Sequence, residues 1–128
     1  MSVQKGDGLA SQPESVIKRH VYEYLCMCPE FFGFISTNTG IYDPTRKCFR
    51  KRTSGQMLGV SDIIGSWHGI FLAVEIKTPT GRLTEPQKEF QRRVIEKGGV
   101  AFVIHSVEEI VDLVQSLRIA GDENTSNN

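Results

Sequence analysis

The sequence predicts an α/β domain in which a mixed β-sheet is flanked by helices, with the elements in the order αβββαβα. Two observations support this class. Three helix starts carry the capping-box pattern, a Ser or Thr followed three residues later by Glu or Gln. Between them lie short apolar runs of strand length, bounded by glycine or proline. The 128 residues are enough for one domain with its own hydrophobic core.

The first half of the chain begins with a helix. It is expected to start at the capping box Ser11-Gln12-Pro13-Glu14, and its apolar residues then recur at helical spacing until Pro29. A first strand is expected over residues 31–37. The basic segment 41–53 should form a hairpin or a loop.

The second and third strands are expected over residues 60–66 and 70–78. Because only the tight turn Trp67-His68-Gly69 joins them, they should be antiparallel neighbours. The third strand is almost continuously apolar, as expected of a strand buried on both faces of the sheet.

The capping box Thr84-Glu85-Pro86-Gln87 predicts a second helix, which Gly98-Gly99 should end. A fourth strand follows over residues 99–105, and the pattern Ser106-Val107-Glu108-Glu109 begins the last helix. The strand–helix–strand crossover predicts that the third and fourth strands are parallel. We expect one domain over residues 11–120, between a disordered segment 1–10 and a disordered polar tail 121–128.

Composition narrows the functional class. Lys and Arg total 15, as do Asp and Glu, so the net charge gives no global signal for nucleic acid. Three cysteines cannot close a disulfide framework, and they indicate reduced thiols in a cytoplasmic protein. The first ten residues lack the apolar core of a signal peptide, and no apolar run is long enough to span a membrane.

Charged residues interrupt the most apolar strand. Glu75 and Lys77 are two residues apart, so both side chains lie on one face of the sheet. Burying a charge without a partner is costly, which implies that something stabilises them. Asp62 lies in the adjacent strand, from which it can approach Glu75. The alternative is an exposed Glu75–Lys77 ion pair without further function.

Such a group suits hydrolysis of phosphodiesters. The carboxylates of Asp62 and Glu75, together with the backbone carbonyl of Ile76, are oxygen ligands of the kind that bind Mg²⁺ or Mn²⁺. A bound cation lowers the pKa of water and neutralises charge on a phosphate. Lys77 can orient or deprotonate the attacking water and offset developing negative charge.

Several ordered motifs together resemble the VRR-NUC (virus-type replication-repair nuclease) family, a branch of the PD-(D/E)xK nucleases. They are Gly59-Val60-Ser61-Asp62-Ile63-Ile64, Ala73-Val74-Glu75-Ile76-Lys77, Gly81-Arg82-Leu83-Thr84 with Gln87, and the strand Gly98-Gly99-Val100-Ala101-Phe102-Val103. The resemblance runs from about residue 14 to residue 117. It implies a restriction-endonuclease-like core and metal-dependent cleavage of DNA.

The resemblance also implies roles for single residues. Asp62 and Glu75 match the metal-binding acids of the family, and Lys77 matches its catalytic lysine. Glu14 matches a first-helix glutamate that completes the site, directly or through a water, and Gln87 matches a glutamine on the following helix. Both also occupy the last position of a capping box, so capping is an equal alternative for each. Ser61 departs from the family pattern, which has proline there.

Basic residues are the candidates for DNA contact, since they neutralise phosphates, and one aromatic residue among them could stack on a base. A solvated basic loop is the alternative for the first group. The candidates are Arg46, Lys47, Phe49, Arg50, Lys51 and Arg52 in the loop, and Arg82, Lys88 and Arg92 beyond the site.

The resemblance extends to assembly and context. Stand-alone members of the family resemble junction resolvases, so we expect a homodimer that cuts branched DNA such as a Holliday junction. The context implied is a phage or prophage protein acting in the host cytoplasm. The alternatives are a catalytically silent DNA-binding module on the same fold and a protein-interaction domain.

Overall fold

The computed structural model describes residues 12–36, 42–49 and 57–126. Its elements are α2 (Glu14–Cys26), β1 (Phe31–Ile35), β2 (Tyr42–Asp43), β3 (Cys48–Phe49), β4 (Ile63–Trp67), β5 (Ile70–Ile76), α3 (Glu85–Glu96), β6 (Val100–Ile104) and α4 (Val107–Ser126).

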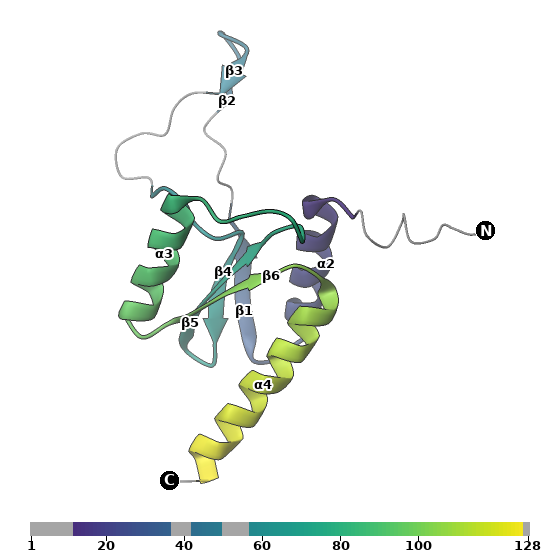
Figure 1. The fold of residues 1–128 in the computed structure, drawn as a ribbon, viewed down its shortest axis with the longest axis vertical. Helices are drawn as coiled ribbons and strands as arrows, with labels where there is room; N and C mark the ends of the chain where they lie inside the picture. Colours follow the sequence, from purple (N-terminus) through teal and green to yellow (C-terminus); the bar gives the residue numbers. More distant parts are fainter. Residues whose placement is uncertain (1–11, 37–41, 50–56, 127–128) are drawn as a thin grey trace, which may run out of the picture.

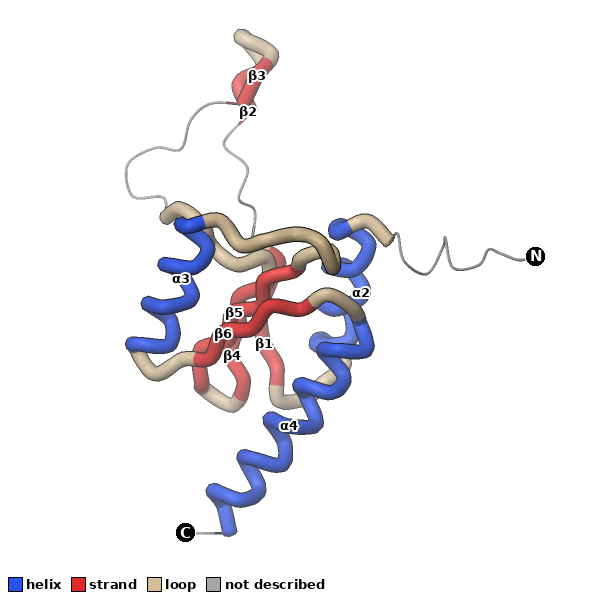
Figure 2. Tube along the Cα trace, in the orientation of Figure 1, coloured by secondary structure: helices blue, strands red, loops and turns tan. Residues whose placement is uncertain are grey.

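A four-stranded mixed sheet with the strand order β1-β4-β5-β6 forms the centre of the molecule (Figure 1). The pairs β1–β4 and β4–β5 are antiparallel, and β5–β6 is parallel. Helices α2 and α4 cover one face, and α3 covers the other (Figure 2). The predicted class, the order αβββαβα and the parallel crossover are therefore confirmed. No helix within the described ranges is long and apolar enough to cross a membrane.

The basic segment contains the predicted hairpin. Strands β2 and β3 pair antiparallel as a sheet of their own, through Tyr42–Phe49 and Asp43–Cys48. Lys47 in the turn has a φ of 55°, in the left-handed region. The residues that join this hairpin to β1 and β4 lie outside the described part of the chain.

A two-residue turn sets the register of β4 and β5. Trp67 pairs directly with Ile70, so only His68 and Gly69 form the loop. Both have positive φ, 50° and 85°, which is the backbone conformation of the turns that fit the twist of a hairpin. The predicted tight turn is confirmed, and it determines which residue of β4 lies opposite each residue of β5.

Strand β5 is the centre of the core. Leu72, Val74 and Ile76 are fully buried on the side of α2 and α4, and Ala73 packs on the other side against Phe90 and Val94 of α3. Each large aliphatic side chain buried in this way contributes about 1.5–3 kcal/mol. The prediction of a strand buried on both faces is confirmed for residues 72–76.

Two helix boundaries differ from the sequence expectation. Pro13 is the N-cap of α2 without any side-chain cap, so the capping box at Ser11 is wrong. The Pro13 carbonyl accepts the first hydrogen bonds of the helix, from the N–H groups of Val16 and Ile17. The helix α2 therefore begins after Pro13. At the other end, α4 continues to Ser126, beyond the expected start of a polar tail at Gly121. A single glycine costs a helix only about 1 kcal/mol, and no proline stops it.

The other two helix starts follow their patterns. The Thr84 hydroxyl accepts from the Gln87 N–H, and the Gln87 side chain accepts from the Thr84 N–H, which confirms that capping box. At α4 the Ser106 hydroxyl accepts from the Glu109 N–H, but the Glu109 carboxylate accepts from the N–H of His105, one residue earlier than the box requires.

The approach to β4 packs against the start of α3, and this contact yields a stability prediction. Gly59 has a φ of +73°, and a Cβ added there would lie 2.2 Å from the Pro86 carbonyl oxygen. We expect Gly59→Ala to lower the free energy of unfolding by more than about 2 kcal/mol, because it adds both strain and overlap. Chemical denaturation measures this. Gly121→Ala is the control and should be neutral or slightly stabilising, because a Cβ added there would meet no other side chain or distant backbone within 4 Å. Equal stability of the Gly59→Ala variant and the wild type would contradict the packing.

Candidate active site

Asp62 and Glu75 lie opposite each other on the two central strands of the sheet, where β4 begins and β5 ends. Ile63 pairs with Val74, and the same register continued by one residue sets Asp62 against Glu75. In such a pair the two Cβ atoms are about 4.5–5.5 Å apart. The Ile76 N–H donates a hydrogen bond of 2.8 Å to Asp62 Oδ2, which orients the Asp62 carboxylate towards β5. The predicted approach of the two carboxylates is therefore present.

Glu75 is buried and only half satisfied. The residue is 2% exposed. Its Oε2 accepts a hydrogen bond of 3.2 Å from Gln87 Nε2, whereas its Oε1 is buried with no hydrogen-bond partner in the part of the chain that the structure describes. Burial raises the pKa of the Glu75 carboxyl to about 8, and the nearby Asp62 carboxyl adds to the increase. The positive charge of Lys77 opposes the shift, and Glu14 reinforces it.

Gln87 caps α3 and also contacts Glu75. Its Oε1 accepts from the Thr84 N–H at 2.9 Å and so caps α3. Its Nε2 donates to Glu75 Oε2. One amide has one acceptor and one donor end, so the cap determines which end faces the carboxylate. The capping box thus fixes a hydrogen-bond donor in the site.

Lys77 follows directly after β5 and is half-buried. Its N–H donates to the Ile104 carbonyl at 3.0 Å, which continues the pairing with β6 by one residue. This holds the backbone of Lys77 as part of the sheet. Its ammonium is near enough to lower the pKa of Glu75, so it belongs to the same site.

Lys18 is a member of the site that the sequence analysis missed. Its Nζ lies 3.5 Å from Asp62 Oδ1, and the two side chains are only 29% and 13% exposed. Lys18 comes one helical turn after Glu14 on α2, so it shares the helix face that Glu14 presents. That spacing is the signal that would have identified it.

Glu14 lies farther from the pair. It is the first residue of α2, half-buried, and its charge raises the pKa of Glu75. It therefore does not occupy the last position of a capping box, and the capping alternative for Glu14 is wrong. In the described ranges, no three His, Cys, Asp or Glu side chains are grouped closely enough to hold a metal ion. Glu14 thus contributes charge to the site without joining Asp62 and Glu75 as a third adjacent carboxylate.

The chemistry of the donors fits a divalent cation. Glu75 Oε1 is an acceptor buried with no donor, next to a second carboxylate. The Ile76 N–H faces Asp62, and because the N–H and C=O of one strand residue face the same neighbouring strand, its carbonyl faces that side too. Two carboxylates and a backbone carbonyl are the hard oxygen ligands that Mg²⁺ and Mn²⁺ prefer.

The structure places the described candidates for DNA binding in the hairpin, in the loop before α3 and on α3 itself. Arg46 and Lys47 are exposed in the hairpin turn and Phe49 is in β3, whereas Arg50, Lys51 and Arg52 lie outside the described residues. Arg82 is exposed in the loop before α3.

Lys88 and Arg92 are less available to DNA than the sequence suggested. Lys88 Nζ lies 3.1 Å from Glu85, and Arg92 forms ion pairs of 2.8 and 2.7 Å with Glu89 and Glu96. Each is already neutralised by acidic neighbours on its own helix.

Comparison of the chain with models of protein families, with curated protein sequences and with solved structures gives no match. The resemblance to the VRR-NUC family therefore stays a prediction that depends on the motifs quoted above.

The burial of Glu75 predicts how stability depends on pH. The folded protein keeps the Glu75 proton up to about pH 8, whereas the unfolded chain loses it near pH 4.5. Folding therefore binds a proton in this range, and the contribution of Glu75 to stability is lost as the pH rises through it. In metal-free buffer we expect Glu75→Gln to remove this loss, so that the variant is more stable than the wild type near pH 8. Denaturation at several pH values measures this, with the exposed Glu89→Gln as control. Parallel pH profiles for the wild type and Glu75→Gln would show that Glu75 is not protonated in the fold.

Proposed function

We propose that this protein is a divalent-metal-dependent endonuclease that hydrolyses DNA phosphodiester bonds. The observation that supports this most strongly is the pairing of Asp62 with the buried Glu75, whose Oε1 has no hydrogen-bond partner among the described residues. An isolated ion pair between Glu75 and Lys77 would need neither the burial of Glu75 nor a second carboxylate opposite it. Holding two carboxyl groups against each other, one of them buried, is costly, and a silent binding module has no reason to retain such a pair.

Asp62, Glu75 and the carbonyl of Ile76 would hold Mg²⁺ or Mn²⁺, and the bound cation would supply a more acidic water and neutralise charge on the phosphate. Neighbouring residues position the two carboxylates. The Ile76 N–H orients Asp62, and Gln87 orients Glu75 while its other end is held by the cap of α3. Lys77 extends from the same face of the sheet as Glu75, where its ammonium can orient the attacking water and offset the negative charge of the transition state.

The preference for branched DNA and the homodimer are finer parts of the proposal, and the resemblance supports them. One observation favours assembly: the edge strand β1 exposes Phe32 and Phe34, which are 84% and 57% exposed. Burying such side chains between two copies would be favourable. A two-fold dimer would present two active sites to a symmetric junction.

The nuclease proposal predicts the result of a cleavage assay. We expect labelled four-way junctions to be cut faster than linear duplex or single strands in Mg²⁺ or Mn²⁺, and not in EDTA. Glu75→Gln and Asp62→Asn should each lower the cleavage rate at least about 100-fold, because each removes a ligand and alters the charge of the site. Glu89→Gln, on the exposed surface of α3, is the matched control and should cut normally. Cutting that survives both site substitutions would contradict the proposal.

Lys18 gives a separate prediction, because its ammonium and a metal ion would compete for Asp62 Oδ1. We expect Lys18→Met to bind Mn²⁺ several-fold more tightly than the wild type, as measured by isothermal titration calorimetry. Lys88→Met removes the same charge from an ion pair on the outer surface of α3 and should leave the affinity unchanged. Weaker binding by Lys18→Met would mean that Lys18 supports the metal site instead of competing with it.

A further inference from the structure

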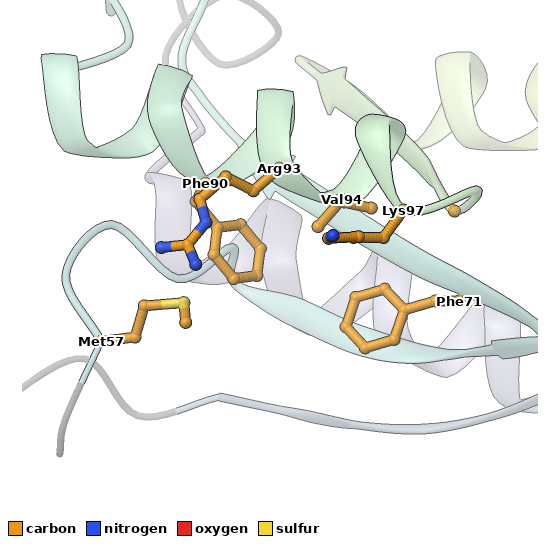
Figure 3. Close-up of a pocket in the computed structure, with 7 residues that line it drawn as sticks. Met57, Phe71, Phe90, Arg93, Val94 and Lys97 are labelled. Atoms are coloured by element: carbon orange, nitrogen blue, oxygen red, sulfur yellow. The ribbon is translucent and has the colours of Figure 1, made fainter.

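A pocket lies on the α3 side of the sheet, at the C-terminal half of α3. It has a volume of about 410 Å³, in the range of small-ligand sites, and is lined by Met57, Phe71, Phe90, Arg93, Val94, Lys97 and Gly99 (Figure 3). Phe90 is 8% exposed and closes the pocket from α3, whereas Phe71 on β5 is 47% exposed. The pocket therefore offers an accessible aromatic ring against an apolar wall.

The charges at this pocket differ from those on the rest of α3. Lys88 and Arg92 are neutralised by glutamates on the same helix. Arg93 and Lys97 form no ion pair with any described residue, and both extend from α3 over the pocket (Figure 3). Among the basic residues between 85 and 97, the two without an ion pair to a described residue are therefore the two that lie beside the aromatic ring.

The pocket lies on the same side of the sheet as Glu75. Phe71 and Glu75 are four residues apart on β5, so both side chains point to the α3 face. Four residues of a strand span about 13 Å. Because Phe90 and Val94 of α3 cover Ala73 between them, a strand must pass beside the helix and needs at least about four nucleotides of about 3.4 Å each.

We propose that this pocket binds one unpaired nucleotide of the DNA strand being cut, about four or more nucleotides from the cleaved bond. Its base stacks on Phe71, and Arg93 and Lys97 neutralise the adjoining phosphates. The inference rests on the proposed nuclease function, and it specifies the substrate further, as DNA with a single-stranded part next to the cleavage site.

The combination of groups favours a nucleotide over a segment of protein. An apolar peptide would contact only Phe71, Phe90 and Val94. It would offer no negative charge to Arg93 and Lys97, which would lose their hydration without compensation. A nucleotide has an aromatic face for the ring and negative charge for both cations, which is how single strands are bound without regard to sequence.

The test measures DNA binding without cleavage. Full-length Glu75→Gln in EDTA is mixed with duplexes that have a single-stranded arm, with 2-aminopurine at each arm position in turn. We expect the probe fluorescence to change at one position on binding, and Phe71→Leu to abolish this change and to weaken binding at least about fivefold. The leucine keeps the apolar contact of the side chain and removes only the aromatic ring, and thermal unfolding verifies that the variant is folded.

Paired charge variants separate a local contact from general attraction. Arg93→Gln/Lys97→Gln should weaken binding and reduce the slope of log affinity against log salt by about 1.4, whereas Lys88→Gln/Arg92→Gln should change neither, although it removes the same charge. Equal losses in both double variants, or a probe signal that Phe71→Leu leaves intact, would overturn the proposal. So would a change from dimer to monomer in Phe71→Leu with no effect on the probe, which would assign the pocket to a contact between copies.

These outcomes are independent of the nuclease activity. Base insertion without metal-dependent cutting by the wild type would support the pocket and refute the nuclease. Metal-dependent cutting with no probe signal at any position would do the reverse.

Discussion

The candidate site depends on the burial of the Glu75 carboxyl in the middle of the molecule. Burial disfavours its ionised form, and the carboxyl of Asp62 opposite disfavours it further. One oxygen is satisfied by Gln87 and the other has no donor in the described protein. Apolar surroundings strongly disfavour a buried carboxylate unless a bound cation or a proton neutralises its charge. The surrounding structure is arranged so that the group is held in one position.

Three unrelated local features produce that position. The two-residue turn at His68 and Gly69 sets the register that places Asp62 opposite Glu75. The cap of α3 orients the amide of Gln87. The apolar residues of β5, buried on both faces, keep the strand that carries Glu75 and Lys77 from shifting relative to its neighbours, because a shift by one residue would expose the core. Residues far from the chemistry therefore determine its geometry.

Much of this could be predicted from the sequence, because it follows from local rules. The nearly continuous apolar run of β5, the tight turn and the Thr84 capping box each depend on neighbouring residues only, and each was confirmed. The pairing of Asp62 with Glu75 follows from the turn once its length is known. The predicted start of the first helix and the predicted end of the last helix were wrong. Helix α2 begins after Pro13 without a side-chain cap, and the single glycine at position 121 does not stop α4.

Other parts depend on contacts between distant segments and could not be read from the sequence. Lys18 reaches Asp62 from another element, and whether a cation on α3 is free depends on which glutamates lie within its reach. From the sequence, Lys88 and Arg92 therefore looked available for DNA. In the structure it is Arg93 and Lys97 that have no ion-pair partner among the described residues. The pocket at Phe71 arises only where β5, α3 and the segment before β4 meet.

The most direct test of the account is whether a divalent cation stabilises the fold through Glu75. The free energy of unfolding is measured near neutral pH as Mn²⁺ is added, for the wild type and Glu75→Gln. A ligand that binds only the folded state stabilises it by about 2.7 kcal/mol at a concentration of about 100 times its dissociation constant. We predict a gain of this size in the wild type and none in the variant. No gain in the wild type, or an equal gain in both proteins, would contradict a metal site at Asp62 and Glu75.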